Sequence, residues 1–439
     1  MAIRPNQITD EGLRGSPSVL FLAALLGVSA IFSFAFAQTA TNDLPLTLTA
    51  AVEIAVSSNP VLTGLRAKTQ AMQERPAQAK ALPNPMLTYS GMDAAEGGRW
   101  PDTGEKRLMV QQEFPWFGKR ELRERIAAKD AEASAHELDA MTRELVMRVK
   151  ETYFDLYAVR SVIAITRDEQ AVIRQMVKIS ETQYATGSSS QADVIKAQTE
   201  ITMLKQKLLE MQAQENTLKA KLNTLLNRRA DEAVGPLEKA PDAGRLPDDA
   251  GALFANAAKN RHEVLAAQMQ IERYGLEKKL MEKEHLPDYK LGLEYRSIDR
   301  EDDMIMATVS VELPIRKAKY QAAVREAEKM VESSQAAREA AERQSALDVQ
   351  DASFKLRTAR RTLDLYRNEL VPQAEARFKA SEAGYRTGKS DFLDFLESER
   401  FLLNAKTMVA MTEGAVGMQT ARLEWAACVD LAVPCNDRR

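Results

Sequence analysis

The chain has 439 residues, with 60 Lys and Arg against 63 Asp and Glu, and a formal net charge of −3. This balance gives no strong electrostatic field, which argues against a nucleic-acid-binding protein. Aromatic residues make up only 6% of the chain, and Ala, Glu, Gln, Lys and Leu dominate its middle, so long helices are expected.

The N-terminus has the pattern of an export signal. Two arginines precede an apolar run over residues 19–36, which leads into Ala35-Phe36-Ala37 before Gln38. This is the order of charged region, apolar core and small-residue cleavage site in a signal peptide, predicted here as residues 1–37. An uncleaved membrane anchor is the alternative. Because the residue after the predicted cleavage is not cysteine, no lipid anchor is expected.

Proline, glycine and a change of hydrophobic period divide the mature chain into consecutive segments. They are an N-terminal segment with a first helix (38–81), a first β-hairpin (82–117), a first helical hairpin (118–229), a linker and helix (230–285), a second β-hairpin (286–314), a second helical hairpin (315–427) and a C-terminal tail (428–439).

The first half begins with a helix over residues 49–81, capped by Thr49, which Pro60 either bends or restarts. A weak strand is predicted over 86–92 and an alternating strand over 108–114, with Leu108, Val110 and Phe114 on one face. Residues 119–186 contain no Pro or Gly, which predicts a helix of roughly 100 Å at ~1.5 Å per residue. A return helix starts at Ser190 or Gln191 and runs to about residue 228.

The second half repeats this plan. A helix is predicted over 250–284, then alternating strands over 289–296 and 305–313, a helix over 315–385 interrupted near Pro372, and a return helix over 391–427. In the tail, Cys428 and Cys435 could form a disulfide in an oxidising compartment, and a pair of free thiols is equally open.

A ten-residue pattern occurs once in each half. Tyr184-Ala185-Thr186-Gly187 is followed by Asp193, and Tyr385-Arg386-Thr387-Gly388 is followed by Asp394, six residues after the glycine in both copies. Each copy lies between two long helical segments. The repeat indicates a duplicated unit in which a tight turn closes a helical hairpin twice at one end of the molecule.

The strands are typical of a transmembrane β-barrel, although a soluble half-buried sheet alternates in the same way. Lipid tolerates no open sheet edge, and four strands cannot close a usable barrel. The chain is therefore expected to pool strands with copies of itself. A dimer would give eight strands packed solid by side chains, and a trimer would give twelve strands with a lumen. The long amphipathic helices have no compact core to join and should form a coiled-coil-like assembly.

Together these pieces resemble the TolC family of outer membrane efflux proteins. The matching features are the opening Leu46-Thr47-Leu48-Thr49-Ala50-Ala51, the Leu82-Pro83-Asn84-Pro85 entry to the first strand and the duplicated Tyr-x-Thr-Gly turns. The branch paired with heavy-metal and cation exporters is the most similar. The resemblance implies a mainly α fold with a small β part. It also implies a homotrimer in the outer membrane of a Gram-negative cell, with a twelve-stranded barrel and a periplasmic helical tunnel.

In function, the resemblance implies a passive exit duct, without enzymatic activity or a cofactor, that is gated at its periplasmic tip. A periplasmic adaptor and an inner-membrane pump, of the resistance-nodulation-division type, are the implied partners. By motif, Asp193 falls at an aspartate that pairs with the tyrosine here occupied by Tyr385. Asp394 and Glu397 fall at the acidic positions that ring the constriction, and Ser390 stands where some members have an arginine. The implied adaptor-contacting positions in the tip turns are Tyr184, Thr186, Gly187, Ser190, Thr387, Gly388 and Ser390.

Each of these residues also has a structural interpretation. The three acids could be solvated residues of a first helical turn, favoured by the helix dipole, and the tyrosines could pack the hairpin ends. The glycines could serve only the turns.

The sequence gives less support to two other classes of function. An exported coiled-coil adaptor or structural protein without a barrel would need many more soluble strands. An enzyme or metal site lacks support, because the three histidines are scattered, no Gly-rich phosphate loop or Gly-x-Ser-x-Gly motif occurs, and the 18 methionines are spread through helices and strands.

Overall fold

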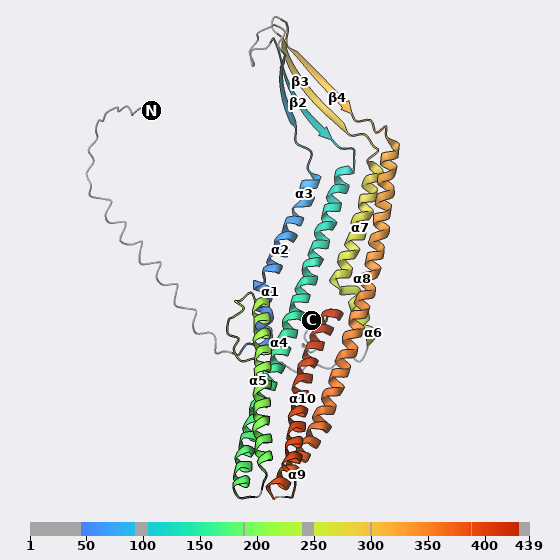
Figure 1. The fold of residues 1–439 in the computed structure, drawn as a ribbon. Coiled ribbons are helices and arrows are strands. Elements are labelled where there is room, and N and C mark those ends of the chain that lie inside the picture. Colours follow the sequence, from blue (N-terminus) through green and yellow to red (C-terminus); the bar gives the residue numbers. More distant parts are fainter. Residues whose placement is uncertain are drawn as a thin grey trace, which may run out of the picture.

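The four strands lie at one end of an elongated molecule and the two hairpin turns at the other, with the long helices running between them (Figure 1). The computed structural model describes residues 45–92, 104–187, 189–238, 250–298, 301–387 and 389–429. The predicted signal peptide, Gly388 and Cys435 lie outside these ranges.

The first predicted helix is three helices, α1 (Leu48–Ser58), α2 (Pro60–Gln73) and α3 (Arg75–Lys80). Its cap is Thr47 rather than Thr49, since the Thr47 hydroxyl accepts a hydrogen bond from the Ala50 N–H at 3.0 Å. Asn59 caps α2 in turn, and Pro60 takes the first helical position, where a missing N–H costs nothing. Pro60 therefore restarts the helix.

Of the helices in the described ranges, none alone has the length and apolar character needed to cross a membrane. The bent pair Leu48–Ser58 and Pro60–Lys80, which meet at 47°, has them jointly by length and composition.

The sheet joins the two halves of the chain. Its order is β1 (Met86–Met92), β2 (Glu105–Phe114), β3 (Tyr289–Ile298) and β4 (Met304–Val311), with all three pairings antiparallel. The second strand starts three residues earlier than predicted, and the fourth ends before Leu313. Within the described residues, β1 and β4 each pair on one side only, so both edges of the sheet are open.

The register places most of the apolar residues of the four strands on one face, and the apolar residues that fall on the other face include Met86, Met109, Met304 and Met306. Cross-strand partners on the first face include Leu87 with Val110, Val110 with Leu293, and Leu291 with Val309. These side chains are exposed, with Leu87 at 66% and Val309 at 69% of full accessibility. A sheet that offers a continuous apolar face to its surroundings needs an apolar solvent or a partner.

The opposite face of the sheet carries charged residues and ion pairs beside these methionines. Glu105 pairs with Arg107 on its own strand and with Arg296 across the sheet, while Lys290 lies 3.2 Å from Glu113. One face thus suits lipid and the other water.

The junction between the sheet and the helices is held by a buried lysine. Lys119, only 1% exposed, donates to the Asp288 carboxylate and to the Leu286 carbonyl, both at 2.9 Å. The same Asp288 oxygen accepts the Trp116 N–H at 2.6 Å. A buried charge is tolerated when it is paired and hydrogen-bonded in this way.

The long helices match their predicted extents closely. The first hairpin is α4 (Lys119–Ala185), of 67 residues, and α5 (Gln191–Leu225), and the second is α8 (Lys317–Leu365) with α9 (Val371–Arg386), returning through α10 (Phe392–Ala427). Between α8 and α9 lies a π-helical turn, Tyr366–Leu370. Pro372 cannot donate a backbone hydrogen bond, and the wider turn before it accommodates this defect.

The helix predicted over 250–284 is instead two helices, α6 (Ala250–Asn260) and α7 (His262–Lys283), with Arg261 between them. Arg261 is 4% exposed, donates to Asp348 at 2.7 Å and lies over the Trp425 ring at 4.2 Å. These tertiary contacts fix an extended backbone at Arg261, and the local sequence pattern does not reveal them.

Helix α10 packs very closely against α4. A Cβ atom added at Gly417 would lie 2.2 Å from the Phe154 ring, and one at Gly414 would lie 2.6 Å from the Ala158 methyl group. These two helices belong to different halves of the chain, so this contact joins the two hairpins side by side.

Candidate functional site at the hairpin tips

The two hairpin turns lie next to each other at the end of the molecule opposite the strands (Figure 1). Thr186 ends α4 and Thr387 ends α9 with nearly the same backbone angles. Each threonine hydroxyl donates back to the carbonyls three and four residues earlier, at 3.0 and 3.2 Å for Thr186 and 3.1 and 2.9 Å for Thr387. The duplicated sequence therefore builds the same helix ending twice.

The backbone conformation of the first turn explains its glycine. Gly187 has φ +75°, a left-handed conformation that a side chain disfavours, while a Cβ there would meet nothing within 4 Å. Its counterpart Gly388 lies outside the described residues. In the second turn Gly384 allows a close approach, since a Cβ there would lie 2.6 Å from the Ser390 hydroxyl.

Ser390 is thus part of the turn. Its hydroxyl donates to the Ser381 carbonyl at 3.3 Å, and its N–H and that of Lys389 both reach the Gly384 carbonyl.

The helices that follow the turns are capped at equivalent positions with different chemistry. Ser190 caps α5 in a reciprocal box, in which its hydroxyl accepts the Asp193 N–H and the Asp193 carboxylate accepts the Ser190 N–H. Asp391 caps α10 alone, accepting the Phe392 N–H at 2.7 Å. Asp394 occupies the position equivalent to Asp193 and is exposed.

The electrostatics of Asp193 follow from this cap. Burial raises its pKa, but hydrogen bonds from Ser190, Ser189 and Lys196 outweigh burial and lower the pKa below its usual range. The carboxylate is held in its charged form at the helix N-terminus, where the dipole also favours it.

Tyr385 belongs to the core of the tip. It is 5% exposed, its ring stacks on Phe395 at 5.7 Å and tilts against Phe392 at 5.4 Å, and its hydroxyl lies 3.0 Å from the Ser180 hydroxyl. Among the described residues of this chain, the hydrogen-bond partner of Tyr385 is Ser180 on α4 rather than Asp193. Burial raises the pKa of Tyr385. Tyr184, its counterpart in the first turn, is 49% exposed.

The predicted ring acids lie on the exposed side of α10. Asp394 and Glu397 are three residues apart, which places both carboxylates on one face of the helix. Glu397 has Arg377 of α9 at 3.9 Å, a distance at which an exposed pair contributes little stability. Both carboxylates are therefore accessible on the surface of the single chain.

A buried acidic cluster next to the tip was not predicted. Glu399 on α10 is 0% exposed, and within the described part of the chain neither carboxylate oxygen has a hydrogen-bond donor. Burial and the neighbouring Glu169 carboxylate raise the pKa of Glu399 from 4.5 to about 10. A carboxyl pair of this kind is satisfied only when it shares a proton, so we assign Glu399 the protonated form at neutral pH.

A third buried carboxylate, beside Glu399 and Glu169, is neutralised by an arginine. Glu200 on α5 is 4% exposed and accepts two hydrogen bonds from Arg400, that from Nε at 2.9 Å. The sequence does carry a signal for the cluster, because Glu399 falls in the apolar stripe formed by Phe392, Phe395, Leu396 and Leu403. An acid at a stripe position is a buried-acid candidate.

The family model described as outer membrane efflux protein matches residues 51–228 and again 253–427. The chain belongs to the outer membrane efflux protein family. Its two halves match the same model, which confirms the duplication. The protein is an outer membrane channel component of an efflux system, and channels of this family work with an adaptor and an inner-membrane pump.

Individual relatives agree with this assignment. The chain is 24% identical over 370 residues to the cobalt-zinc-cadmium resistance protein CzcC of Cupriavidus metallidurans, covering 82% of this chain and 85% of the relative. It is 23% identical over 350 residues to the pyoverdine export outer membrane protein OpmQ of Pseudomonas aeruginosa, covering 76% and 71%.

Solved structures show the same fold. The CusC structure superposes with a TM-score of 0.75 at 18% identity, covering 90% of this chain and 95% of CusC. The outer membrane protein VceC of Vibrio cholerae superposes with a TM-score of 0.73 at 19% identity, covering 87% and 95%. The mainly helical fold with a small sheet is thereby confirmed.

Proposed function

We propose that three copies of this chain form one passive exit duct, in which three four-stranded sheets close a twelve-stranded barrel in the outer membrane. The observation that carries the proposal is the sheet with two open edges, one exposed apolar face and one charged face. Each unpaired edge group costs several kcal/mol in hydrocarbon, so the edges must pair with those of neighbouring copies.

The charged face of the sheet supports three copies over two. Two copies would give eight strands, whose interior is filled by side chains, and the charged residues Arg107, Glu294 and Arg296 would be packed together there. Twelve strands leave a water-filled lumen in which these charges stay hydrated. The helices continue the lumen as a tunnel, and residues 1–37 serve as the export signal.

The gate lies at the hairpin tips in this proposal. Three copies of Asp394 and Glu397 form an acidic ring whose like charges repel each other and attract cations. Asp193 and Tyr385 act as gate residues indirectly, by fixing the turn that presents this ring. The alternative role for the ring acids is that of solvated first-turn residues.

The exposed tip turns form the docking surface for the adaptor. The positions assigned to this contact are Tyr184, Thr186, Gly187, Ser190, Thr387, Gly388 and Ser390. A pump of the resistance-nodulation-division type is proposed as the inner-membrane partner, supported by the similarity to a cobalt-zinc-cadmium resistance protein.

Single-channel recording tests the duct and its gate together. In a planar lipid bilayer the protein should give discrete conductance steps, and the variant Asp394→Ala/Glu397→Ala should conduct more or show less block by divalent cations. The variant Glu181→Ala, which removes an exposed acid from the other hairpin, is the control. Unchanged traces in the double variant would overturn the acidic ring, and absence of any steps would overturn the duct.

Docking is tested separately at the first turn. Gly187→Val forces a β-branched residue into a left-handed backbone and should impair export while the channel still assembles. Normal export by this variant contradicts the docking role.

A further inference from the structure

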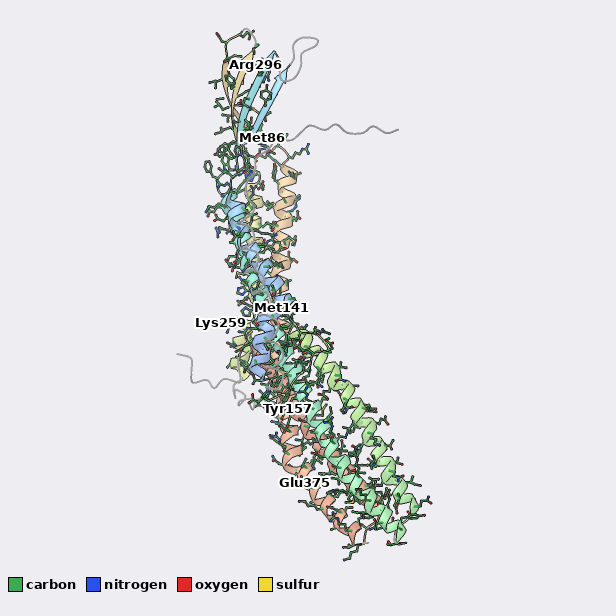
Figure 2. The ribbon with its side chains drawn as sticks, turned by 90° about the vertical axis from the view of Figure 1, so that its left-hand side faces the viewer. Met86, Met141, Tyr157, Lys259, Arg296 and Glu375 are labelled. Carbon is green, nitrogen blue, oxygen red and sulfur yellow. The ribbon has the colours of Figure 1, made fainter. Side chains whose placement is uncertain are left out.

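Two of the three histidines, far apart in the sequence, lie together halfway along the helical body. His136 and Asp139 are three residues apart on α4 and share one face of that helix. His262 is the first residue of α7, directly after the break at Arg261. In Figure 2 the labelled residues Met141 and Lys259, which neighbour these groups in the sequence, lie at the same level of the molecule.

The spacing of the three side chains suits a metal ion. One ligand atom from each of His136, Asp139 and His262 lies within 4.8 Å of the other two. His262 Nδ1 lies 3.7 Å from Asp139 Oδ2, and the two histidine rings have centroids 5.8 Å apart. Ligands about 2.1 Å from a tetrahedral ion are about 3.4 Å apart, so small side-chain rotations complete the geometry.

Both histidines have an unused nitrogen. The Nδ1 atoms of His136 and His262 are buried, and neither has a hydrogen-bond partner within the described ranges of the chain. A buried polar atom without a partner destabilises the folded protein, and a bound ion would remove this cost. The 3.7 Å separation from Asp139 is too long for a hydrogen bond to offset this cost.

Two charged groups beside the histidines have opposite effects on an incoming cation. The Arg143 guanidinium repels a cation, and the Asp139 carboxylate attracts it and offsets that repulsion.

An ion can reach this point from solvent. A cavity of about 430 Å³ has Asp139, Arg143 and His262 in its wall. The Lys150 ammonium and the Glu424 carboxylate, 2.6 Å apart, also line it and neutralise each other.

We propose that His136, Asp139 and His262 form a binding site for a divalent first-row transition ion such as Zn²⁺ or Co²⁺, with water at the remaining position. Two imidazole nitrogens and one carboxylate oxygen are a donor set for these ions rather than for Mg²⁺ or Ca²⁺. The ion links the middle of α4 to the start of α7, and the site is independent of the acidic ring at the tip and of the number of chains in the channel.

Direct binding tests the site in the intact channel. The protein is purified in detergent with an affinity tag that lacks histidine, treated with chelator and titrated with Zn²⁺ by calorimetry. Cys428 and Cys435 are replaced with serine throughout, because thiolates bind zinc. One ion per chain is expected, and His136→Ala or His262→Ala should weaken binding at least about ten-fold.

The third histidine supplies the matched control. His285→Ala removes an imidazole at the start of the loop before β3 and should leave Zn²⁺ affinity unchanged. Zn²⁺ should also raise the melting temperature of the parent protein and of His285→Ala, but not that of His136→Ala/His262→Ala. Equal Zn²⁺ affinity in the parent and the double variant would overturn the site, as would the absence of binding to the parent.

Should His262→Ala fail to fold, His136→Gln decides the question. It keeps a polar side chain of similar size on the face of a continuous helix, and only a metal role predicts lost binding with an unchanged melting temperature in chelator. Retained binding by His136→Gln contradicts the proposal.

Discussion

The two hairpin turns share one sequence pattern and one helix ending, yet their aspartates have different tasks. In the first turn Asp193 completes the cap of α5 through Ser190. In the second turn Asp391 provides the cap at the position equivalent to Ser190, and Asp394 is left exposed. The two copies thus differ at the cap residue, and only in the first copy does the following aspartate take part in the cap.

The turns also differ in what they bury. The second hairpin packs Tyr385, Phe392 and Phe395 into one core cluster, whereas Tyr184 of the first turn is exposed. The aromatic core is thus a feature of the second copy, and the first copy presents its tyrosine to the surroundings. Equivalent residues in the two copies are thus natural pairs for testing each role.

The largest difference is expected between Phe395 and its counterpart Val194. Phe395 is 0% exposed, so Phe395→Ala should cost about 3–5 kcal/mol. Val194→Ala, at a half-buried site, should cost about 1 kcal/mol. Thermal unfolding followed by circular dichroism measures both, and equal losses would show that the tip has no single core.

The buried Glu399 should make stability depend on pH. Its pKa is raised from 4.5 to about 10 on folding, so the folded state binds more protons than the unfolded state between these values. The contribution of Glu399 is complete below pH 4.5 and is lost as pH rises toward 10. The fall between pH 6 and 9 should be smaller in Glu399→Gln.

The first copy supplies a precedent for that variant, since Gln198 occupies the position equivalent to Glu399. Glu397→Gln, at an exposed site nearby, is the control and should keep the pH dependence. If the melting curves of the parent and of Glu399→Gln change equally with pH, Glu399 is not a protonated group.

A smaller effect is expected from the tyrosine hydroxyls. Tyr385→Phe leaves the buried Ser180 hydroxyl without its partner and should cost about 1–2 kcal/mol. Tyr184→Phe alters an exposed side chain and should change stability by less than about 0.5 kcal/mol. The same unfolding measurement compares the two variants. If Tyr385→Phe does not change the stability, the hydrogen bond between Tyr385 and Ser180 does not stabilise the tip.

The smallest difference in stability is expected between variants of the two aspartates. Asp193→Ala breaks the capping box and should cost about 1 kcal/mol, while Asp394→Ala should be neutral within about 0.5 kcal/mol. Comparable losses would show that Asp394 also has a structural role.

Much of the fold was readable from the sequence because it depends on local periodicity. The alternation around Leu291 and Leu293 gave the strands and their apolar face, and the Tyr-x-Thr-Gly pattern gave both turns. Pro60 and Pro372 marked the helix breaks through backbone chemistry alone.

The rest depends on contacts between segments that are far apart in the chain. The break at Arg261 is fixed by Asp348 and Trp425, the partner of Tyr385 is Ser180, and the histidines that appeared scattered include an adjacent pair. Among features of this kind, only the burial of Glu399 can be inferred from the local sequence, because Glu399 falls in an apolar stripe. The gate and adaptor roles of the tip residues stay predictions.

The number of chains in the assembled channel tests the central claim most directly. The mature protein, solubilised from outer membranes, is analysed by light scattering coupled to size-exclusion chromatography, with the detergent contribution subtracted. We predict three chains per particle, as twelve strands require. A particle containing one or two chains would contradict the shared barrel.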